Sequence, residues 1–175
     1  MHNTFPNQFY FINTFKKNNI DKLNINTGVI FRNYNKKVSI YEIIQIKKYC
    51  KKRGLKFFLS SNFKLAVKLD LDGSYIPSFN QSLRHLSYKT KSSFIIMGSA
   101  HNVKEIRKKE AQRVKFIFIS SIFKKNKNYL GLYRFRLLSK LTNKNVIALG
   151  GISKLNEKKV NLLNCFGMSG ISYFE

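Results

Sequence analysis

The sequence is short of acidic residues and of residues that cross-link or interrupt a chain. It has 8 Asp and Glu, two cysteines, two prolines and no tryptophan among 175 residues. Two cysteines as far apart as Cys50 and Cys165 indicate neither a disulfide framework nor a zinc site. The chain also shows no signal-peptide pattern, so we expect a reducing, cytoplasmic location.

Long apolar runs are missing as well. The longest stretches, such as residues 115–122, are well short of the roughly 20 residues that a membrane-spanning helix needs. The hydrophobic content is nevertheless 43%, which allows a chain of this length to bury one substantial core. We therefore expect a soluble protein with no membrane partner and a single domain over residues 1–175, with residues 1–8 as a lead-in.

Basic residues are in large excess. There are 33 Lys and Arg, which gives a formal charge of +25, and 26 of the 33 are Lys. Nucleic-acid-binding modules usually gather basic residues in one stripe and rely on Arg for bidentate base contacts, whereas these lysines are spread along the whole chain. We expect salt-sensitive, non-specific attraction to polyanions and no specific nucleic-acid partner.

The clearest helix signal begins at Ser39. Glu42 follows three residues later, the spacing at which each side chain can accept a hydrogen bond from the other's backbone N–H. Apolar residues such as Ile43 and Ile46 then recur at helical spacing until Gly54 ends the pattern.

Strand-like and helix-like segments alternate along the chain. Continuous apolar strand runs are typical of a parallel sheet covered by helices. Eight such runs in βα order favour a closed barrel over the alternative, an open doubly wound sheet. The expected strands lie at 9–12, 28–34, 55–59, 73–76, 94–97, 114–120, 145–149 and 170–173, and the expected helices at 19–23, 39–53, 62–69, 102–112, 129–141 and 155–163.

The predicted fold class is therefore α/β, a compact single-domain (β/α)8 TIM barrel that lacks the last helix. Such barrels typically have about 250 residues, so this one must have short loops and helices. The sequence ends at Glu175, directly after the eighth expected strand. We expect the missing helix to leave an apolar flank that a homodimer contact would cover, or a marginally stable fold.

Two glycine-containing segments at the ends of the last strands predict phosphate binding. Gly150 and Gly151 follow the seventh strand, where they would let the backbone approach an anion. Ser169 and Gly170, at the final strand, would complete a phosphate cup. The alternatives are a plain tight turn at the first segment and, for the neighbouring Gly167, a helix C-cap.

Three further polar residues follow strands at the same end of the predicted barrel. Ser99 and His101 follow the fifth strand and offer a hydroxyl donor and an imidazole for proton transfer. Arg32 ends the second strand and could clamp an anionic oxygen. A structural histidine at a helix start and a surface ion pair are the alternatives.

These segments, in this order, resemble the thiamine phosphate synthase/TenI family. The resemblance extends throughout residues 55–175 and is looser over the first fifty residues. It rests on the order and spacing of several motifs, none of which is diagnostic alone. They are FLSSN (58–62), LDGSYI (71–76), MGSAH (97–101), FISSIF (118–123), IALGGI (147–152) and GMSGI (167–171).

The resemblance implies an enzyme of thiamine biosynthesis that joins an aminopyrimidine pyrophosphate to a thiazole phosphate and releases pyrophosphate. It places Arg32 and Ser99 at the pyrophosphate, Gly150 and Gly151 at the thiazole phosphate, and His101 with Ser99 as catalytic candidates. Lys125 and Lys127 would replace the family's pyrophosphate-binding lysine. The substrate pocket would be lined by Ser60, Ser61, Tyr75 and Ile122.

Other positions depart from the family pattern. The family's glutamine and lysine in the second strand are Ile30 and Tyr34, although Lys36 and Lys37 are close in sequence. Its Asn-Asp pair after the third strand is Ser60-Ser61, and a later acidic ligand falls near Asn80. Magnesium prefers charged oxygen ligands, so the Mg²⁺ that the resemblance implies should bind weakly, and we assign no metal ligands.

Three functions remain open. The first is the synthase reaction. The second is a TenI-like thiazole tautomerase that uses His101 for proton transfer and avoids the magnesium problem. The third is a non-catalytic barrel that binds a phosphate ester.

Overall fold

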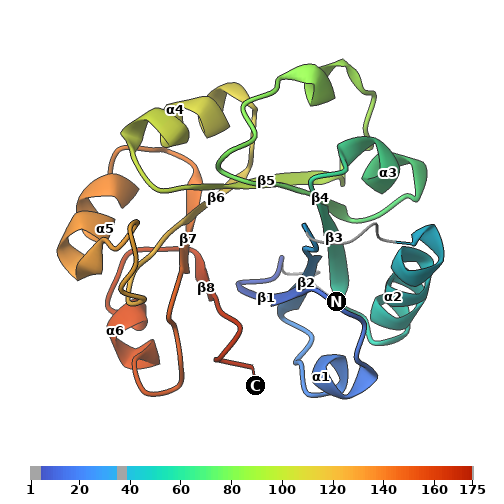
Figure 1. Ribbon diagram of the computed structural model, residues 1–175, viewed down its shortest axis with the longest axis horizontal. Helices are drawn as coiled ribbons and strands as arrows, with labels where there is room; N and C mark the ends of the chain where they lie inside the picture. The colour runs from blue at the N-terminus through green and yellow to red at the C-terminus, as the bar shows by residue number, and fades with distance from the viewer. Residues whose placement is uncertain (1–4, 35–38, 175) are drawn as a thin grey trace.

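The computed structural model describes residues 5–34 and 39–174 and contains eight parallel strands closed into a barrel, as predicted. The strands follow one another around the barrel in chain order, and β8 closes it by pairing with β1 through Gln8↔Met168 and Phe9↔Ser169. Helices lie on the outside of the strands (Figure 1). The strands are β1 (Gln8–Ile12), β2 (Thr27–Phe31), β3 (Lys56–Ser60), β4 (Gly73–Ile76), β5 (Ile95–Ala100), β6 (Phe116–Ile119), β7 (Asn145–Leu149) and β8 (Gly167–Ser169). The helices are α1 (Lys17–Asp21), α2 (Ile40–Lys52), α3 (Phe63–Lys68), a 3₁₀ turn η1 (Arg84–Ser87), α4 (Val103–Ala111), α5 (Gly131–Ser139) and α6 (Glu157–Asn161).

Aromatic rings fill the barrel interior. Side chains on a strand alternate between its two faces, so every second residue points inward. The Phe118 ring lies 5.2 Å from that of Phe9 and 5.3 Å from that of Tyr75, both edge-to-face. Gly28 leaves space for these rings, because a Cβ there would lie 2.9 Å from Phe9. The interior cluster comprises Phe9, Phe11, Ile30, Phe58, Tyr75, Met97, Phe116, Phe118 and Ile147.

Two further clusters fill the layer between strands and helices. One lies under α2 and α3 and includes Ile43, Ile46 and Cys50. The other lies under α4 to α6 and includes Ile106 and Phe135. The outward-facing strand residues are therefore also apolar, which explains the continuous hydrophobic runs in the sequence.

The last strand lies three residues earlier than the sequence predicted. It spans Gly167–Ser169, and residues 170–174 form a turn in place of the strand expected at 170–173. Closure of the barrel decides this, because only the earlier segment pairs with both β7 and β1. In the turn, Phe174 packs 5.2 Å from the Tyr10 ring. Figure 1 shows this C-terminal coil, without a helix, on the side of the barrel between α6 and α1. The flank expected to be bare is thus partly covered, and the homodimer contact stays a prediction.

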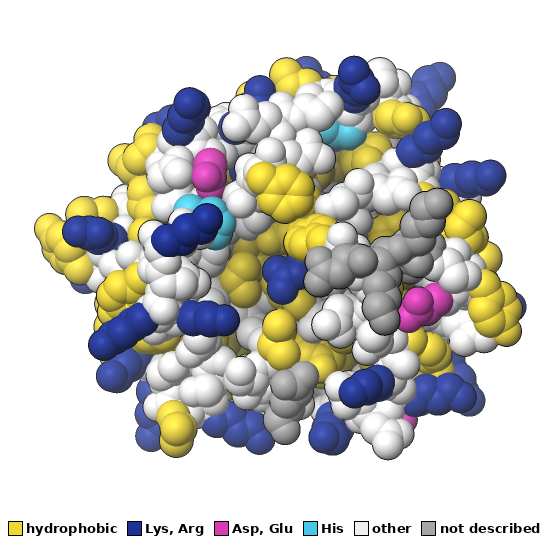
Figure 2. Space-filling view, in the orientation of Figure 1, with side chains coloured by type: hydrophobic (Ala, Val, Ile, Leu, Met, Phe, Trp, Pro, Cys, Tyr) yellow, Lys and Arg dark blue, Asp and Glu magenta, His cyan; other side chains and the backbone are white. Residues whose placement is uncertain are grey.

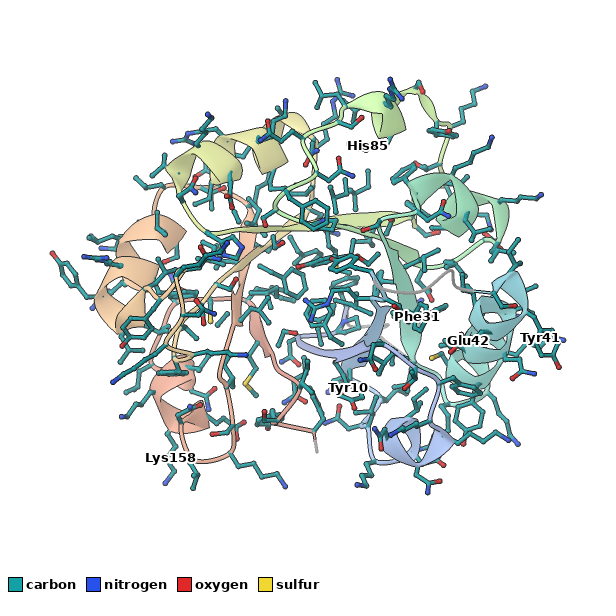
Figure 3. The ribbon with its side chains drawn as sticks, viewed as in Figure 1. Tyr10, Phe31, Tyr41, Glu42, His85 and Lys158 are labelled. Carbon is teal, nitrogen blue, oxygen red and sulfur yellow. The ribbon has the colours of Figure 1, made fainter. Side chains whose placement is uncertain are left out.

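Two other local expectations were right only in part. Ser39 caps α2 by accepting a hydrogen bond from Tyr41 N, but Glu42 accepts from Phe15 N instead of capping in return. Glu42 therefore joins α2 to the chain after β1. Tyr41 lies in the first turn of α2, and in Figure 3 its side chain points away from the barrel. The helix expected at 19–23 spans Lys17–Asp21.

The surface is basic on the face toward the viewer in Figure 2, where Lys and Arg side chains surround a central hollow and acidic side chains are few. This matches the even spread of lysines along the sequence. Both cysteines are unpaired. Within residues 5–34 and 39–174, no helix has the length and apolar character needed to cross a membrane.

Candidate functional site

Arg32 lies at the carboxyl end of the barrel, directly after β2. Its backbone N donates to Ile12 O at 2.7 Å, which extends the β1–β2 ladder by one step. Its guanidinium lies 4.4 Å from the centre of the Phe11 ring, a cation–π distance. Arg32 and Lys16 line a cavity of about 180 Å³. None of the described residues that line it is acidic, so the cavity suits an anion.

The two serines at the end of β3 form a hydrogen-bonded chain with Tyr34. The Tyr34 hydroxyl lies 3.3 Å from Ser60 Oγ, which lies 3.4 Å from Ser61 Oγ. The Arg32 guanidinium is 6.0 Å from the Tyr34 ring. The structure thus brings Arg32 and the predicted pocket residues Ser60 and Ser61 into one polar cluster. Lys36 and Lys37 lie outside the described residues.

Tyr75 and Ser99 lie deeper in the same end of the barrel. Tyr75 is 2% exposed and belongs to the interior cluster. Burial raises the pKa of Tyr75, and its hydrogen bond with Ser99 opposes this only partly. The phenol therefore stays neutral and can bind a ligand only as a hydrogen-bonding group.

His101 is held in one orientation by its neighbours. Its Nδ1 lies 2.8 Å from Ser120 O and 3.0 Å from Ser120 Oγ, and its backbone N donates to Glu105 Oε2 at 2.7 Å. A carbonyl oxygen can only accept, so this contact favours the tautomer with the proton on Nδ1. Nε2 then carries the lone pair that a proton-transfer role requires.

The Gly150–Gly151 turn packs tightly on the loop after β6. Both glycines have positive φ, 106° and 73°. A Cβ on Gly150 would lie 2.5 Å from Ser121 Oγ, and one on Gly151 would lie 2.6 Å from Lys124 N. Only glycine fits this conformation and this spacing. Gly151 is exposed, and its carbonyl accepts from Asn156 Nδ2 at 2.9 Å, so the group that it can offer to an anion is its backbone N–H.

The second half of the expected phosphate cup is less open. Ser169 is fully buried, and its hydroxyl donates to Phe9 O at 2.7 Å. Gly170 is buried, and its N–H points to the same carbonyl at 3.3 Å. Both groups help to close the barrel between β8 and β1, so neither offers a free donor to a phosphate in this structure.

Ile122 does not line the mouth of the barrel, which corrects its place in the predicted substrate pocket. It is 0% exposed and packs in the layer under α4 to α6. Its backbone N–H donates to Leu149 O at 3.0 Å, which joins this segment to the end of β7. Lys125 and Lys127 are exposed on the loop that follows.

The residues at the family's metal positions do not fit a divalent cation. Ser60 and Ser61 offer neutral hydroxyls already bonded to each other. Asn80 Oδ1 accepts from Ser82 N at 3.0 Å, and Asn80 O accepts from the Lys109 ammonium at 3.0 Å. Among the residues that the structure describes, no group of three His, Cys, Asp or Glu is placed to hold a metal. Hard cations need charged oxygens, which are missing at these positions.

The sequence did not predict a buried polar pair at the C-terminal end of α4, formed by Lys109 on the helix and Gln112 at its C-cap. Lys109 and Gln112 are both 0% exposed. Lys109 Nζ donates to Pro77 O at 2.8 Å and to Gln112 Oε1 at 2.8 Å, in addition to Asn80 O. Gln112 Nε2 donates to Asn80 O at 2.9 Å and to Ser82 O at 2.8 Å. The only available signal was the position of Lys109, three residues after the buried Ile106. The other two lysines of the helix, Lys104 and Lys108, are exposed and half-buried, respectively.

Comparison with known proteins points to one family. The family model described as thiamine monophosphate synthase matches residues 24–174. A thiamine-phosphate synthase of Prochlorococcus marinus is 30% identical over 81% of this chain and 41% of its own length. One of Methanococcus vannielii is 29% identical over 66% of this chain and 56% of its own length. The chain thus spans about half the length of these relatives.

Solved structures show the same fold. A thiamine phosphate pyrophosphorylase from Pyrococcus furiosus superposes with a TM-score of 0.76 at 18% identity, over 94% of this chain and 84% of that one. The family match covers most of the chain and includes every strand from β2 to β8. The chain belongs to the thiamine monophosphate synthase family.

Proposed function

We propose that this protein joins an aminopyrimidine pyrophosphate to a thiazole phosphate, with release of pyrophosphate, as a thiamine phosphate synthase. The observation that carries the proposal is the acid-free cavity under Arg32, which lies at the same end of the barrel as the exposed Gly150–Gly151 turn. The reaction requires two anionic groups to be held at one end of one barrel. Membership of the family supports this assignment.

Each group has a role in the proposal. Arg32 holds the pyrophosphate, with Lys125 and Lys127 as exposed cations that stabilise it as it leaves. Gly150 and Gly151 hold the thiazole phosphate through backbone N–H groups. Ser60, Ser61 and Tyr75 line the space between, where Ser99 is a further hydrogen-bond partner. The proposal places these steps in the cytoplasm and routes none of them through Mg²⁺.

The test is a product assay with the purified protein. Aminopyrimidine pyrophosphate and thiazole phosphate are mixed with the protein, with Mg²⁺ in one series and EDTA in another, and thiamine phosphate is read as its oxidised fluorescent product. We expect product above a no-enzyme control. Arg32→Gln should reduce it at least about tenfold, since a charged hydrogen bond contributes about 1.5–3 kcal/mol. Arg134→Gln, on the exposed face of α5, is the matched control and should leave it unchanged.

A second candidate activity rests on His101. Its fixed Nδ1 contact leaves Nε2 as a base at the mouth of the barrel, which suits a thiazole tautomerase. His101→Gln should then abolish isomerisation of the thiazole and leave thiazole phosphate binding intact. Binding of thiazole phosphate with neither activity would favour the third function, a non-catalytic barrel that binds a phosphate ester.

A further inference from the structure

A second cavity lies beside the barrel mouth, between α3 and the long connection from β4 to β5. Its volume is about 250 Å³. Hydroxyl and amide groups of Ser61, Asn80 and Ser82 line it, and the cationic side chains are Lys64 and Arg84. None of the described residues that line it is acidic. A cavity of this composition presents positive charge and hydrogen-bond donors together.

The wall of this cavity is held rigidly by the buried pair on α4. The connection contains only the 3₁₀ turn η1 where a barrel usually has a helix, so it needs other support. Lys109 and Gln112 supply it through bonds to the carbonyls of Pro77, Asn80 and Ser82. Gly98 makes room for the lysine, because a Cβ there would lie 2.8 Å from Lys109 Cδ. A site with a preformed wall loses little entropy on binding.

Hydrogen bonds from the same pair help to decide which group of Asn80 can bind a ligand. Both oxygens of Asn80 are engaged, Oδ1 by Ser82 N–H and the carbonyl by Lys109 and Gln112. Each oxygen of Asn80 thus already accepts at least one hydrogen bond, and its amide NH₂ is the donor that it offers to a ligand. The Lys109 ammonium behind it adds positive charge. Such surroundings oppose a metal ion and favour an anion.

The cations at the rim have no competing partners. Lys64 and Arg84 are exposed, and neither forms an ion pair within the described part of the chain. The floor contains His85, whose Nε2 contacts Gln112 O at 2.9 Å. His85 is a residue of η1, and in Figure 3 it lies on the side of this turn that faces the barrel. Lys64 and Arg84 can therefore fold over a bound anion without breaking an existing contact.

We propose that this cavity is a metal-independent anion site that binds a phosphate or pyrophosphate group directly, through Lys64, Arg84 and the Asn80 amide. In this chain, positive side chains thus occupy the region where the family resemblance implies Mg²⁺. The site goes beyond the proposed reaction, because binding here requires neither the aminopyrimidine nor the thiazole.

The test is calorimetric titration of the whole protein with inorganic pyrophosphate in EDTA and physiological salt, which suppresses non-specific attraction. A double variant, Lys64→Gln with Arg84→Gln, is compared with Lys158→Gln plus Lys159→Gln. The control pair is exposed on α6, and Figure 3 shows Lys158 on the opposite side of the barrel from His85. We expect binding without metal, at least about tenfold weaker in the first variant and within about twofold of wild type in the control.

A second measurement localises the anion. In a ¹H–¹⁵N correlation spectrum, pyrophosphate should shift the side-chain amide signal of Asn80, and this shift should persist in Arg32→Gln. Binding that appears only with Mg²⁺, or equal losses in the two double variants, would overturn the proposal. Because no product is formed in either measurement, these results are independent of the synthase assay, and the synthase can fail while the anion site stands.

Discussion

Replacing Gln112 with leucine should destabilise the fold, although the two side chains are of similar size. The change removes the bond to Ser82 O and the acceptor for one Lys109 N–H, whereas Asn80 O keeps its bond to Lys109. An unsatisfied buried polar group costs about 1–3 kcal/mol, more when it is charged. The added apolar contact of leucine offsets about 1 kcal/mol of this. We expect a net loss of about 3 kcal/mol in the free energy of unfolding.

Thermal unfolding followed by circular dichroism measures this loss. For a protein of this size about 1 kcal/mol corresponds to roughly 2–4 °C, so the Tm should fall by roughly 6–12 °C. Gln81→Leu is the matched control, because Gln81 is exposed on the same connection and should change stability by less than about 0.5 kcal/mol. If the two variants unfold at the same temperature, the buried pair does not hold the connection after β4, and the rigid wall inferred for the anion site is wrong.

Three other experiments, two substitutions and one labelling reaction, test the core and its buried groups. Gly28→Ala should cost about 1–3 kcal/mol in urea unfolding, because its Cβ would lie 2.9 Å from the buried Phe9 ring. Burial lowers the pKa of Lys109 to about 8. The native state then binds fewer protons than the unfolded state between pH 8 and about 10.4, so wild-type stability relative to Lys109→Met should rise across this window and stay flat below it. Burial raises the pKa of the Cys50 thiol to about 12, so iodoacetamide at pH 8 should label the half-buried Cys165 first and Cys50 only after unfolding.

The elements that the sequence predicted best are those with strong local signals. The strands at 73–76 and 145–149 were predicted to the residue, because each is followed by a residue that disfavours strand, Pro77 in the first case and Gly150 in the second. The last strand was misplaced, because Ile171 and Tyr173 suit a strand locally while closure of the barrel selects Gly167–Ser169. Long-range pairing of this kind leaves little trace in a local pattern.

For the candidate site too, the sequence predicted where residues lie but not what they contact. Positions such as Arg32 and His101 could be found, since strand ends in a barrel point to one end. What those side chains contact could not be read, and neither could the burial of Ser169 or Ile122. The polar pair on α4 was missed for a physical reason. A lysine on a lysine-rich helix is normally solvated. Lys109 is buried here because its ammonium donates to two carbonyls of a distant connection, Pro77 O and Asn80 O, and to the Gln112 side chain.

The scarcity of acidic residues explains why the site differs from a magnesium site. The sequence has eight, and seven of them lie in the described part of the chain. Each of the seven accepts a hydrogen bond or forms an ion pair that joins local elements. They are Asp21 with Tyr49, Glu42 with Phe15, Asp70 with Lys91, Asp72 with Lys56, Glu105 with His101, Glu110 with Thr142, and Glu157 with Tyr173.

With its described carboxylates used in this way, the chain meets a negatively charged ligand mainly with cations and neutral donors. Lysine and arginine can hold a phosphate without metal. Each brings one positive charge, however, whereas a divalent ion places two at a single point beside the phosphate oxygens. Binding should therefore survive in EDTA while turnover, which needs charge stabilised at the leaving group, is the more sensitive quantity. Retained pyrophosphate affinity with slow synthesis is the combination that this arrangement of charges favours.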